Sequence, residues 1–171
     1  MKRYGRFLLP LVLAGCATPQ GSPLQTLEIT APFDAAAAKL LLADGTNIVK
    51  GNAFMRQQGG GVVTCAGQTV HLIPATPYAS QRAMALYNST ERGMNSRRKF
   101  RFIPDPPEYY TTIRTSRCDS QGNFVFERVA DGDFYVNTRV AWQVASSQQG
   151  GQLMHRVSVR GGQTVSLVIA P

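Results

Sequence analysis

The chain has 171 residues, with 18 Lys and Arg, 10 Asp and Glu, and a formal net charge of +8. This length suffices for one domain with a real core, and no apolar run approaches the roughly 18 residues of a membrane-spanning helix. Three cations lie within the first six residues, and the remaining positive charge is too diffuse to indicate a nucleic-acid-binding protein. The excess instead favours anionic surfaces such as lipid headgroups or polyanionic cell-wall material.

The N-terminus has the layout of a secretory signal. Met1–Arg6 is basic and Phe7–Ala14 is almost wholly apolar, which gives a positive n-region and a short h-region. The stretch ends Leu13-Ala14-Gly15-Cys16, which resembles the bacterial lipobox, so residues 1–15 are predicted to be a lipoprotein signal peptide. The resemblance implies acylation of Cys16 and, with Ala17 next, delivery to the outer membrane facing the periplasm. The alternative is an ordinary signal peptide with a chance cysteine at its end.

Cysteine usage fits an exported protein. Once Cys16 is assigned to lipid, Cys65 and Cys118 remain as an even pair in an oxidising compartment, and we predict that they form a disulfide. Two buried free thiols are the alternative. A zinc site is disfavoured because His71 and His155 are distant from each other and from any ligand spacing. The sequence predicts no metal and no cofactor.

Two short segments precede the main domain. Residues 16–30 begin with a stretch rich in Pro, Gly and small polar residues, which predicts a lipidated cysteine followed by a flexible tether. Leu27–Thr30 is a candidate short extended segment within it. Residues 31–45 predict a short helix, because Asp34 can cap an alanine-rich turn and Asp44-Gly45 ends it.

Residues 46–171 are predicted to form one domain that begins with short strands. Alternation over Ile48–Met55, and the apolar pairs in Val62–Thr64 and Val70–Ile73, predict three strands bounded by glycine turns. Pro77–Asn88 then predicts a helix with Thr76 as its cap, which we expect to cover one side or end of a sheet.

An insertion is predicted over residues 77–107. Its second half is loop-like and carries the chain's densest basic cluster, interleaved with Phe100 and Phe102. The candidate contacts with an anionic surface are Arg97, Arg98, Lys99 and Arg101. The same alternation also describes a strand with its phenylalanines inward and its cations in water, which we prefer.

The last third of the chain is the most regular. Five segments alternate with period two and predict strands: Tyr110–Cys118, Asn123–Val129, Asp133–Gln143, Leu153–Arg160 and Thr164–Ile169. Polar and glycine-rich turns separate them, including Gln149-Gly150-Gly151. Short strands at this spacing indicate an all-β protein, an antiparallel β-sandwich of about seven strands with one or two short helices in insertions.

A family resemblance strengthens this fold prediction. The run from Asp119 to Val136 resembles the stretch D-x-x-G-x-F-x-F-x-x-V-x-x-G-x-Y-x-V of carboxypeptidase regulatory-like domains, with Phe134 in place of the usual tyrosine. The resemblance implies a transthyretin-like (prealbumin-like) sandwich in which Gly122 makes a hairpin turn and Phe124 and Phe126 face the core. In that family the regulatory-like domain is an accessory module and not the peptidase.

Nothing in the sequence indicates an enzyme. A catalytic triad needs a nucleophile, a base and an acid that converge in space, and neither His71 nor His155 has a motif around it. Asp119, Asp131 and Asp133 lie close in sequence, but turn formation explains them better than calcium binding, because no EF-hand-like spacing is present.

Three functions remain in competition. The leading hypothesis is a lipid-anchored, non-catalytic envelope module whose sandwich contacts an envelope protein partner or has a structural role. The second is a carbohydrate- or peptidoglycan-binding module, which needs an exposed aromatic platform. Its candidates are Tyr109 and Tyr110, then Tyr87 and Trp142, the last being better explained as core. The third, a metal-dependent hydrolase, requires His71 and His155 to converge with a carboxylate.

Overall fold

The computed structural model describes residues 24–96 and 98–171, so the signal segment, Cys16 and Arg97 lie outside the described residues. The described residues contain three helices: α1 (Ala35–Leu40), α2 (Pro77–Tyr87) and α3 (Pro107–Thr111). They contain eleven strands: β1 (Gln25–Glu28), β2 (Asn47–Arg56), β3 (Val62–Thr64), β4 (Thr69–Pro74), β5 (Arg92–Asn95), β6 (Phe100–Ile103), β7 (Arg114–Arg117), β8 (Asn123–Val129), β9 (Gly132–Val144), β10 (Ser147–Val159) and β11 (Thr164–Ile169).

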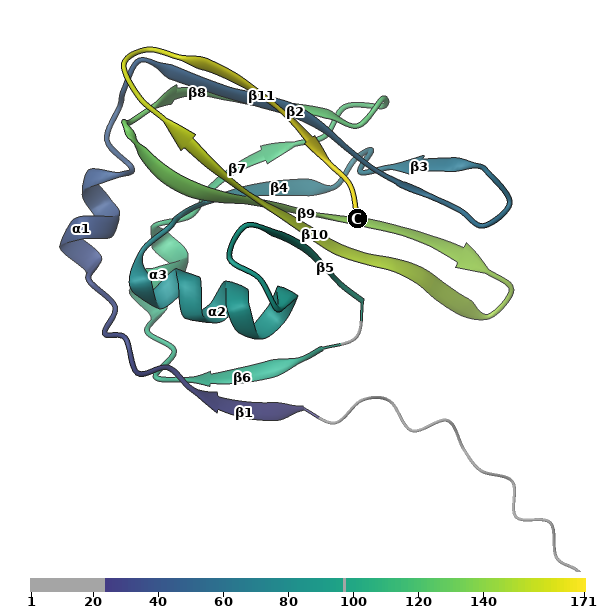
Figure 1. Ribbon diagram of the computed structural model, residues 1–171, viewed down its shortest axis with the longest axis horizontal. Helices are drawn as coiled ribbons and strands as arrows, with labels where there is room; N and C mark the ends of the chain where they lie inside the picture. Colours follow the sequence, from purple (N-terminus) through teal and green to yellow (C-terminus); the bar gives the residue numbers. More distant parts are fainter. Residues whose placement is uncertain (1–23, 97) are drawn as a thin grey trace, which may run out of the picture.

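Two sheets pack face to face and confirm the predicted all-β sandwich (Figure 1). One has five strands in the order β5-β10-β9-β4-β7, and the other is built on β2, which pairs with β11, β3 and β8. Phe124, Phe126, Phe134 and Val136 are buried between the sheets, as alternation predicted. Burial of each of these side chains stabilises the fold by about 1.5–3 kcal/mol, so this core dominates the sandwich.

The sandwich departs from the prediction in strand number and direction. Its two sheets contain nine strands and not about seven, partly because β5 of the insertion joins the edge of the larger sheet. It is also not wholly antiparallel, because β11 runs parallel to β2. The reason is that the chain changes sheets between β10 and β11, so no hairpin fixes their relative direction.

The disulfide prediction is confirmed. Cys65 follows β3 and Cys118 follows β7, and the two residues are bonded with their Cα atoms 5.8 Å apart. Because β3 and β7 belong to different sheets, the bond links the two halves of the sandwich. Both residues are buried in the core.

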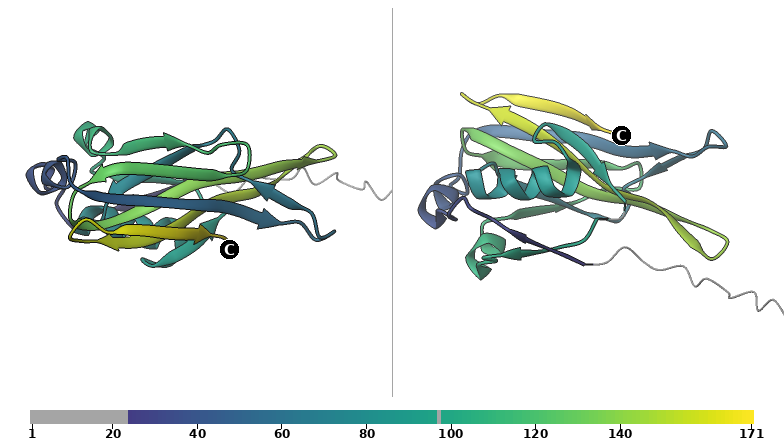
Figure 2. Two further views of the ribbon diagram at one scale, coloured as in Figure 1. Left: turned by 90° about the horizontal axis from the view of Figure 1, so that it is seen from above. Right: turned by 60° about the horizontal axis from the view of Figure 1, so that its bottom comes forward.

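The predicted turn at Gln149-Gly150-Gly151 is wrong. These residues lie inside β10, and the hairpin turn falls earlier, where Ala145 has a φ of 50°. Gly150 has a φ of 91°, and a Cβ there would lie 2.2 Å from the carbonyl oxygen of Val140. Glycine is therefore required at this position because the neighbouring strand β9 lies too close for a side chain. The long β9–β10 hairpin extends, together with β2–β3, at the end of the molecule opposite α1 (Figure 2).

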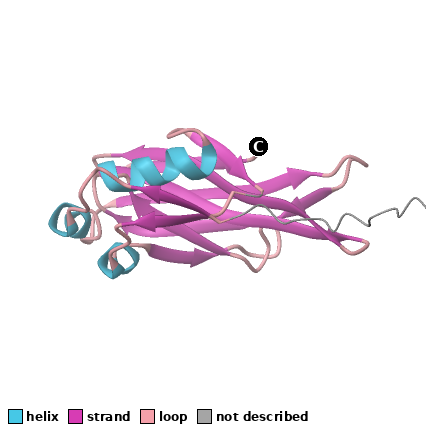
Figure 3. Cartoon of the chain, turned by 90° about the horizontal axis from the view of Figure 1, so that it is seen from below, coloured by secondary structure: helices cyan, strands magenta, loops and turns pink. Residues whose placement is uncertain are grey.

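An outer layer covers the far face of the five-stranded sheet. α2 lies against this face (Figures 1 and 3), and a parallel ribbon of β1 and β6 lies farther from the sheet (Figure 1). Thr76 caps α2 as predicted, since its side chain accepts a hydrogen bond from the Ala79 N–H. Residues of the predicted insertion therefore contribute to a second, smaller hydrophobic core, which lies between the outer layer and the five-stranded sheet.

The N-terminal segments differ in part from the prediction. Residues 25–28 form β1 and Ile29 is buried, so the candidate extended segment at Leu27–Thr30 is confirmed in part, and its strand begins two residues earlier than predicted. Pairing with β6 explains this order, because Gln25–Glu28 aligns with Phe100–Ile103. The short helix within residues 31–45 is confirmed as α1, whose N-cap Asp34 accepts a hydrogen bond from the Ala37 N–H.

Candidate functional site

A buried arginine organises the outer layer. Arg82 lies in the middle of α2, and its side chain is only 11% exposed. Its guanidinium forms a salt bridge with Asp105 and donates hydrogen bonds to the hydroxyls of Tyr78 and Tyr110 at 3.1 and 3.0 Å. Tyr110 in turn donates to Asp105, so one polar network ties α2 to the segment that precedes α3.

Aromatic rings surround the same guanidinium. The Arg82 Cζ atom lies 4.0 Å from the ring centre of Phe102 and 4.5 Å from that of Tyr109, distances at which a cation is attracted to a ring face. Burial acts to lower the pKa of Arg82, but its hydrogen bonds to Asp105 and Tyr110 outweigh that effect and raise it. Arg82 is therefore a permanent positive charge within an aromatic shell.

A cavity of about 300 Å³ lies between α2, α3 and the face of the five-stranded sheet. We call it the tyrosine cavity, because four tyrosines line it: Tyr87, Tyr109, Tyr110 and Tyr135. Arg82 also reaches its wall. The volume is at the lower end of the range for small-molecule sites, roughly 300–1,000 Å³.

Planar polar side chains share this cavity. His71 and Asn137 lie opposite each other on β4 and β9, with His71 Nδ1 3.0 Å from Asn137 Oδ1. The Tyr87 hydroxyl donates to Gln152 Oε1 at 3.3 Å. Burial raises the pKa of Tyr87 to about 12, although a hydrogen bond with Asn137 opposes the shift, so Tyr87 is a neutral hydroxyl at pH 7. The cavity therefore combines aromatic faces with donors and acceptors at fixed positions.

Tyr109 and Tyr110 do not form the exposed pair that the sequence suggested. Tyr109 is 6% exposed and Tyr110 is 51% exposed. The predicted strand over Tyr110–Cys118 begins instead with α3, and on this short helix neighbouring side chains point in different directions. The two rings meet edge to face with centroids 5.3 Å apart. Tyr109 is buried in the smaller core of the outer layer, and Tyr110 is a half-exposed residue of the cavity lining.

The predicted basic cluster divides between two faces. Phe102 is buried in β6 and Arg101 is exposed, which confirms the strand with inward phenylalanines. Arg98 and Lys99 line a second hollow of about 440 Å³, together with Arg139 of β9. We call this hollow the basic pocket. Phe100 and Phe102 also line it, whereas Arg101, on the opposite face of β6, is not part of its lining.

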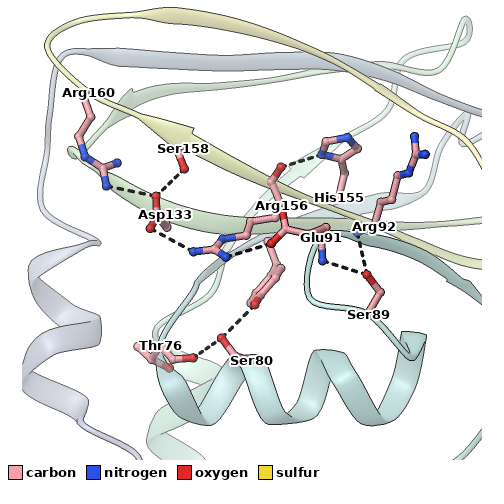
Figure 4. Close-up of polar contacts among 11 residues, drawn as sticks. Thr76, Ser80, Ser89, Glu91, Arg92, Asp133, His155, Arg156, Ser158 and Arg160 are labelled. Atoms are coloured by element: carbon pink, nitrogen blue, oxygen red, sulfur yellow. Dashed lines mark hydrogen bonds and ion pairs between the residues drawn. The ribbon is translucent and has the colours of Figure 1, made fainter.

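The two histidines do not converge. In the sheet register His71 aligns with Asn137, whereas His155 aligns with the neighbouring residue Val136. Since successive residues of a strand point to opposite faces, the two imidazoles lie on opposite sides of the sheet. His155 Nδ1 lies 2.7 Å from the backbone oxygen of Arg156, an interaction drawn in Figure 4. Among residues 24–96 and 98–171, no group of three or more potential metal-ligating side chains is present.

Two acidic side chains that pair with Arg156 have structural roles. Arg156 forms salt bridges with Glu91 of the α2–β5 connection and with Asp133 of β9 (Figure 4). A hydrogen bond from Ser158 and contacts with Arg160 and Arg156 lower the pKa of Asp133. This network fastens the outer layer to the sheet.

Two of the three predicted turn aspartates, Asp119 and Asp131, occupy turns, whereas Asp133 lies within β9. Asp119 Oδ1 accepts hydrogen bonds from the backbone N–H groups of Gln121 and Asn123, and Gly122 has a φ of 85°. Asp131 accepts from the Asn47 side chain and the Gly161 N–H. Both carboxylates thus satisfy turn backbone or side-chain donors, in agreement with the turn interpretation.

Sequence reasoning missed Arg82, His71 as a cavity residue, and Asn137. Arg82 did occupy one helical row with Tyr78 in the predicted helix, but nothing local indicated that this row is buried. His71 and Asn137 are 66 positions apart, and only strand pairing brings them together. Trp142 is partly buried and packs against the sandwich core, as we preferred.

Comparison with known proteins identifies the fold. No family model matches the chain, and no curated protein matches it. The crystal structure of PA1324 from Pseudomonas aeruginosa, described as a candidate carbohydrate-binding protein, is similar, with a TM-score of 0.65 and 20% identity. The match covers 82% of this chain and 99% of that chain, so the two share a fold.

A second match is weaker. Chlorocatechol 1,2-dioxygenase from Pseudomonas putida aligns at 14% identity over 91% of this chain and 70% of its own, with a TM-score of 0.28. That score is too low to indicate a shared fold.

No helix among the described residues has the length and apolar character needed to cross a membrane.

Proposed function

We propose that the protein is a lipid-anchored, non-catalytic module of the cell envelope that binds a carbohydrate in the tyrosine cavity. The observation that carries the proposal is the cavity itself, in which Tyr87, Tyr110 and Tyr135 line the same space as His71 and Asn137. Sugar rings present apolar C–H faces that stack on aromatic rings, and their hydroxyls pair with planar polar side chains. The similar fold of a candidate carbohydrate-binding protein supports the same proposal.

The envelope location rests on the N-terminal sequence. A basic n-region, a short apolar stretch and the sequence Leu13-Ala14-Gly15-Cys16 support export and acylation of Cys16. The disulfide between Cys65 and Cys118 is in keeping with an oxidising compartment such as the periplasm. The carboxypeptidase regulatory-like resemblance and contact with an envelope protein partner stay predictions of the sequence.

The non-catalytic part of the proposal rests on the separation of the candidate groups. His71 and His155 lie on opposite faces of the sheet, and Asp119, Asp131 and Asp133 are engaged in turns or salt bridges. Binding without chemistry is therefore the simplest use of the cavity.

A binding titration tests the carbohydrate proposal. The full chain, purified in a detergent that has no sugar headgroup, is titrated calorimetrically with soluble glycan fragments of the cell wall. Tyr110→Ala removes the exposed ring and is expected to weaken binding about tenfold, whereas Tyr110→Phe keeps the stacking face and most of the affinity. Val125→Ala, on the exposed face of the other sheet, is the control. Absence of glycan binding, or equal affinities for all three variants, contradicts the proposal.

The anchor is tested separately. Intact mass is expected to show that the first fifteen residues are missing and that acyl chains are attached to Cys16. The Cys16→Ser variant is expected to lose membrane association on cell fractionation. A full-length, unacylated chain with a free thiol at Cys16 contradicts the anchor without bearing on the cavity.

A further inference from the structure

The tyrosine cavity and the basic pocket are neighbours with common walls. Arg82, Leu86 and Gln152 line both hollows, so they meet at one place beside α2. The basic pocket adds about 440 Å³ to the 300 Å³ of the tyrosine cavity. The two hollows are therefore side by side, close enough for different parts of one ligand to contact tyrosines in one and cations in the other.

Positive charge gathers in the basic pocket without carboxylates to balance it. Arg98, Lys99 and Arg139 line it, and within residues 24–96 and 98–171 no Asp or Glu belongs to its lining. None of these three cations forms a salt bridge with a described residue, whereas Arg128 and Arg156 elsewhere on the surface do. Unpaired like charges in one hollow repel each other, and an anionic ligand relieves that repulsion.

Two of these cations are held in place by neutral groups. The Arg98 guanidinium donates to the carbonyl oxygen of Ala85 at 3.3 Å, and its backbone N–H donates to Asn95 Oδ1 at 2.8 Å. Arg139 donates to Gln148 Oε1 at 2.6 Å. These contacts orient the side chains and leave their charge uncompensated, so the pocket is prepared for an acid.

Arg82 differs from the three cations of the basic pocket because its charge is balanced within the protein. Its charge is already paired with Asp105, and its guanidinium is held by the Tyr78 hydroxyl and by the rings of Phe102 and Tyr109 where the two hollows share a wall. The attraction for an anion therefore comes from Arg98, Lys99 and Arg139, and the stacking surface comes from Tyr110.

We infer that the ligand is an anionic sugar, whose ring enters the tyrosine cavity and whose carboxylate or phosphate lies in the basic pocket. This inference rests on the proposed function and specifies its ligand class. An acidic sugar and a phosphorylated sugar present the same chemistry to the pocket, so the experiment contains both.

The test compares four probes on the full chain by calorimetry at low and high salt: N-acetylglucosamine, N-acetylmuramic acid, N-acetylglucosamine 6-phosphate and inorganic phosphate. At low salt at least one anionic sugar is expected to bind about tenfold more tightly than N-acetylglucosamine, and high salt narrows the difference because it screens exposed charges. The two anionic sugars together show whether carboxylate or phosphate is preferred.

Variants separate the two hollows. Arg139→Gln and Lys99→Gln are each expected to weaken the anionic sugar about threefold while leaving N-acetylglucosamine unchanged. Both side chains are exposed, so folding is retained. Arg101→Gln removes a cation from the opposite face of β6 and is the matched control.

The outcomes are distinguishable. If neutral and anionic sugars bind equally and Tyr110→Ala weakens both, the anionic inference is overturned and the carbohydrate function stands. If none of the three sugars binds, the anionic inference is overturned, while the carbohydrate function is decided by the titration with glycan fragments. Binding of inorganic phosphate alone then reveals an anion site unconnected with sugars. If Arg101→Gln matches Arg139→Gln, the charge acts over the whole surface and the pocket assignment is overturned.

Discussion

Replacement of Arg82 is the sharpest test of how the outer layer is held. Arg82→Leu removes the salt bridge to Asp105, the two hydrogen bonds to Tyr78 and Tyr110, and the close contact with the ring of Phe102. Loss of one partner of a buried ion pair costs about 3–5 kcal/mol, because the other charge is left uncompensated. Asp105 is 39% exposed, so water can solvate its carboxylate and the lower end of that range applies. We expect the free energy of unfolding to fall by about 3 kcal/mol.

Urea denaturation followed by circular dichroism measures this change. Arg101→Leu, an exposed cation on β6, is the control and is expected to shift the unfolding free energy by less than about 0.5 kcal/mol. Arg82→Leu combined with Asp105→Ala is expected to be less destabilising than the sum of the single changes, since the double variant leaves no unpaired charge. A loss below about 1 kcal/mol for Arg82→Leu, or simple additivity in the pair, refutes the reasoning.

Three further predictions concern the sandwich and its pH dependence. The double variant Cys65→Ala, Cys118→Ala opens a loop of 53 residues and is expected to lose about 4 kcal/mol in urea denaturation, and a loss below about 1 kcal/mol contradicts the inter-sheet role of the bond. The fold lowers the pKa of Asp133, so its contribution is present above the unfolded value of about 4 and is lost as the pH falls below it. Asp133→Asn should reduce the loss of unfolding free energy between about pH 4 and lower pH. An unchanged loss argues that Asp133 does not cause it. The pKa of Tyr87 is raised to about 12, so its contribution is present below about pH 10 and is lost as the pH rises toward 12. Tyr87→Phe should reduce that alkaline loss, and an identical alkaline limb in both proteins contradicts it.

The proposals differ in what they require of the molecule. Carbohydrate binding needs only the tyrosine cavity, which the described residues form without the anchor. The envelope location depends on residues 1–16, and the anionic ligand depends on Arg98, Lys99 and Arg139. Each of these three proposals is therefore tested by a separate experiment.

Local patterns in the sequence were sufficient for much of the sandwich. Asn123–Val129 and Thr164–Ile169 are strands with the predicted bounds, because alternation with period two reflects one buried and one solvated face. The pairing of Cys65 with Cys118 followed from cysteine count and compartment. Thr76 and Asp34 were recognised as helix caps because a cap depends on only three or four adjacent residues.

The candidate site was decided by tertiary structure. Arg82 looks like an ordinary surface residue until residues 100–110 and β1 close over α2, and a charge can be buried there only because Asp105 and two tyrosine hydroxyls converge on it. Gly150 looked like a turn residue because glycine occurs both in turns and where two strands lie too close for a side chain. His71 and Asn137 meet only through the register of β4 and β9. The sequence by itself thus determined the sandwich, whose signals are local, whereas the cavity depends on contacts between residues far apart in the chain.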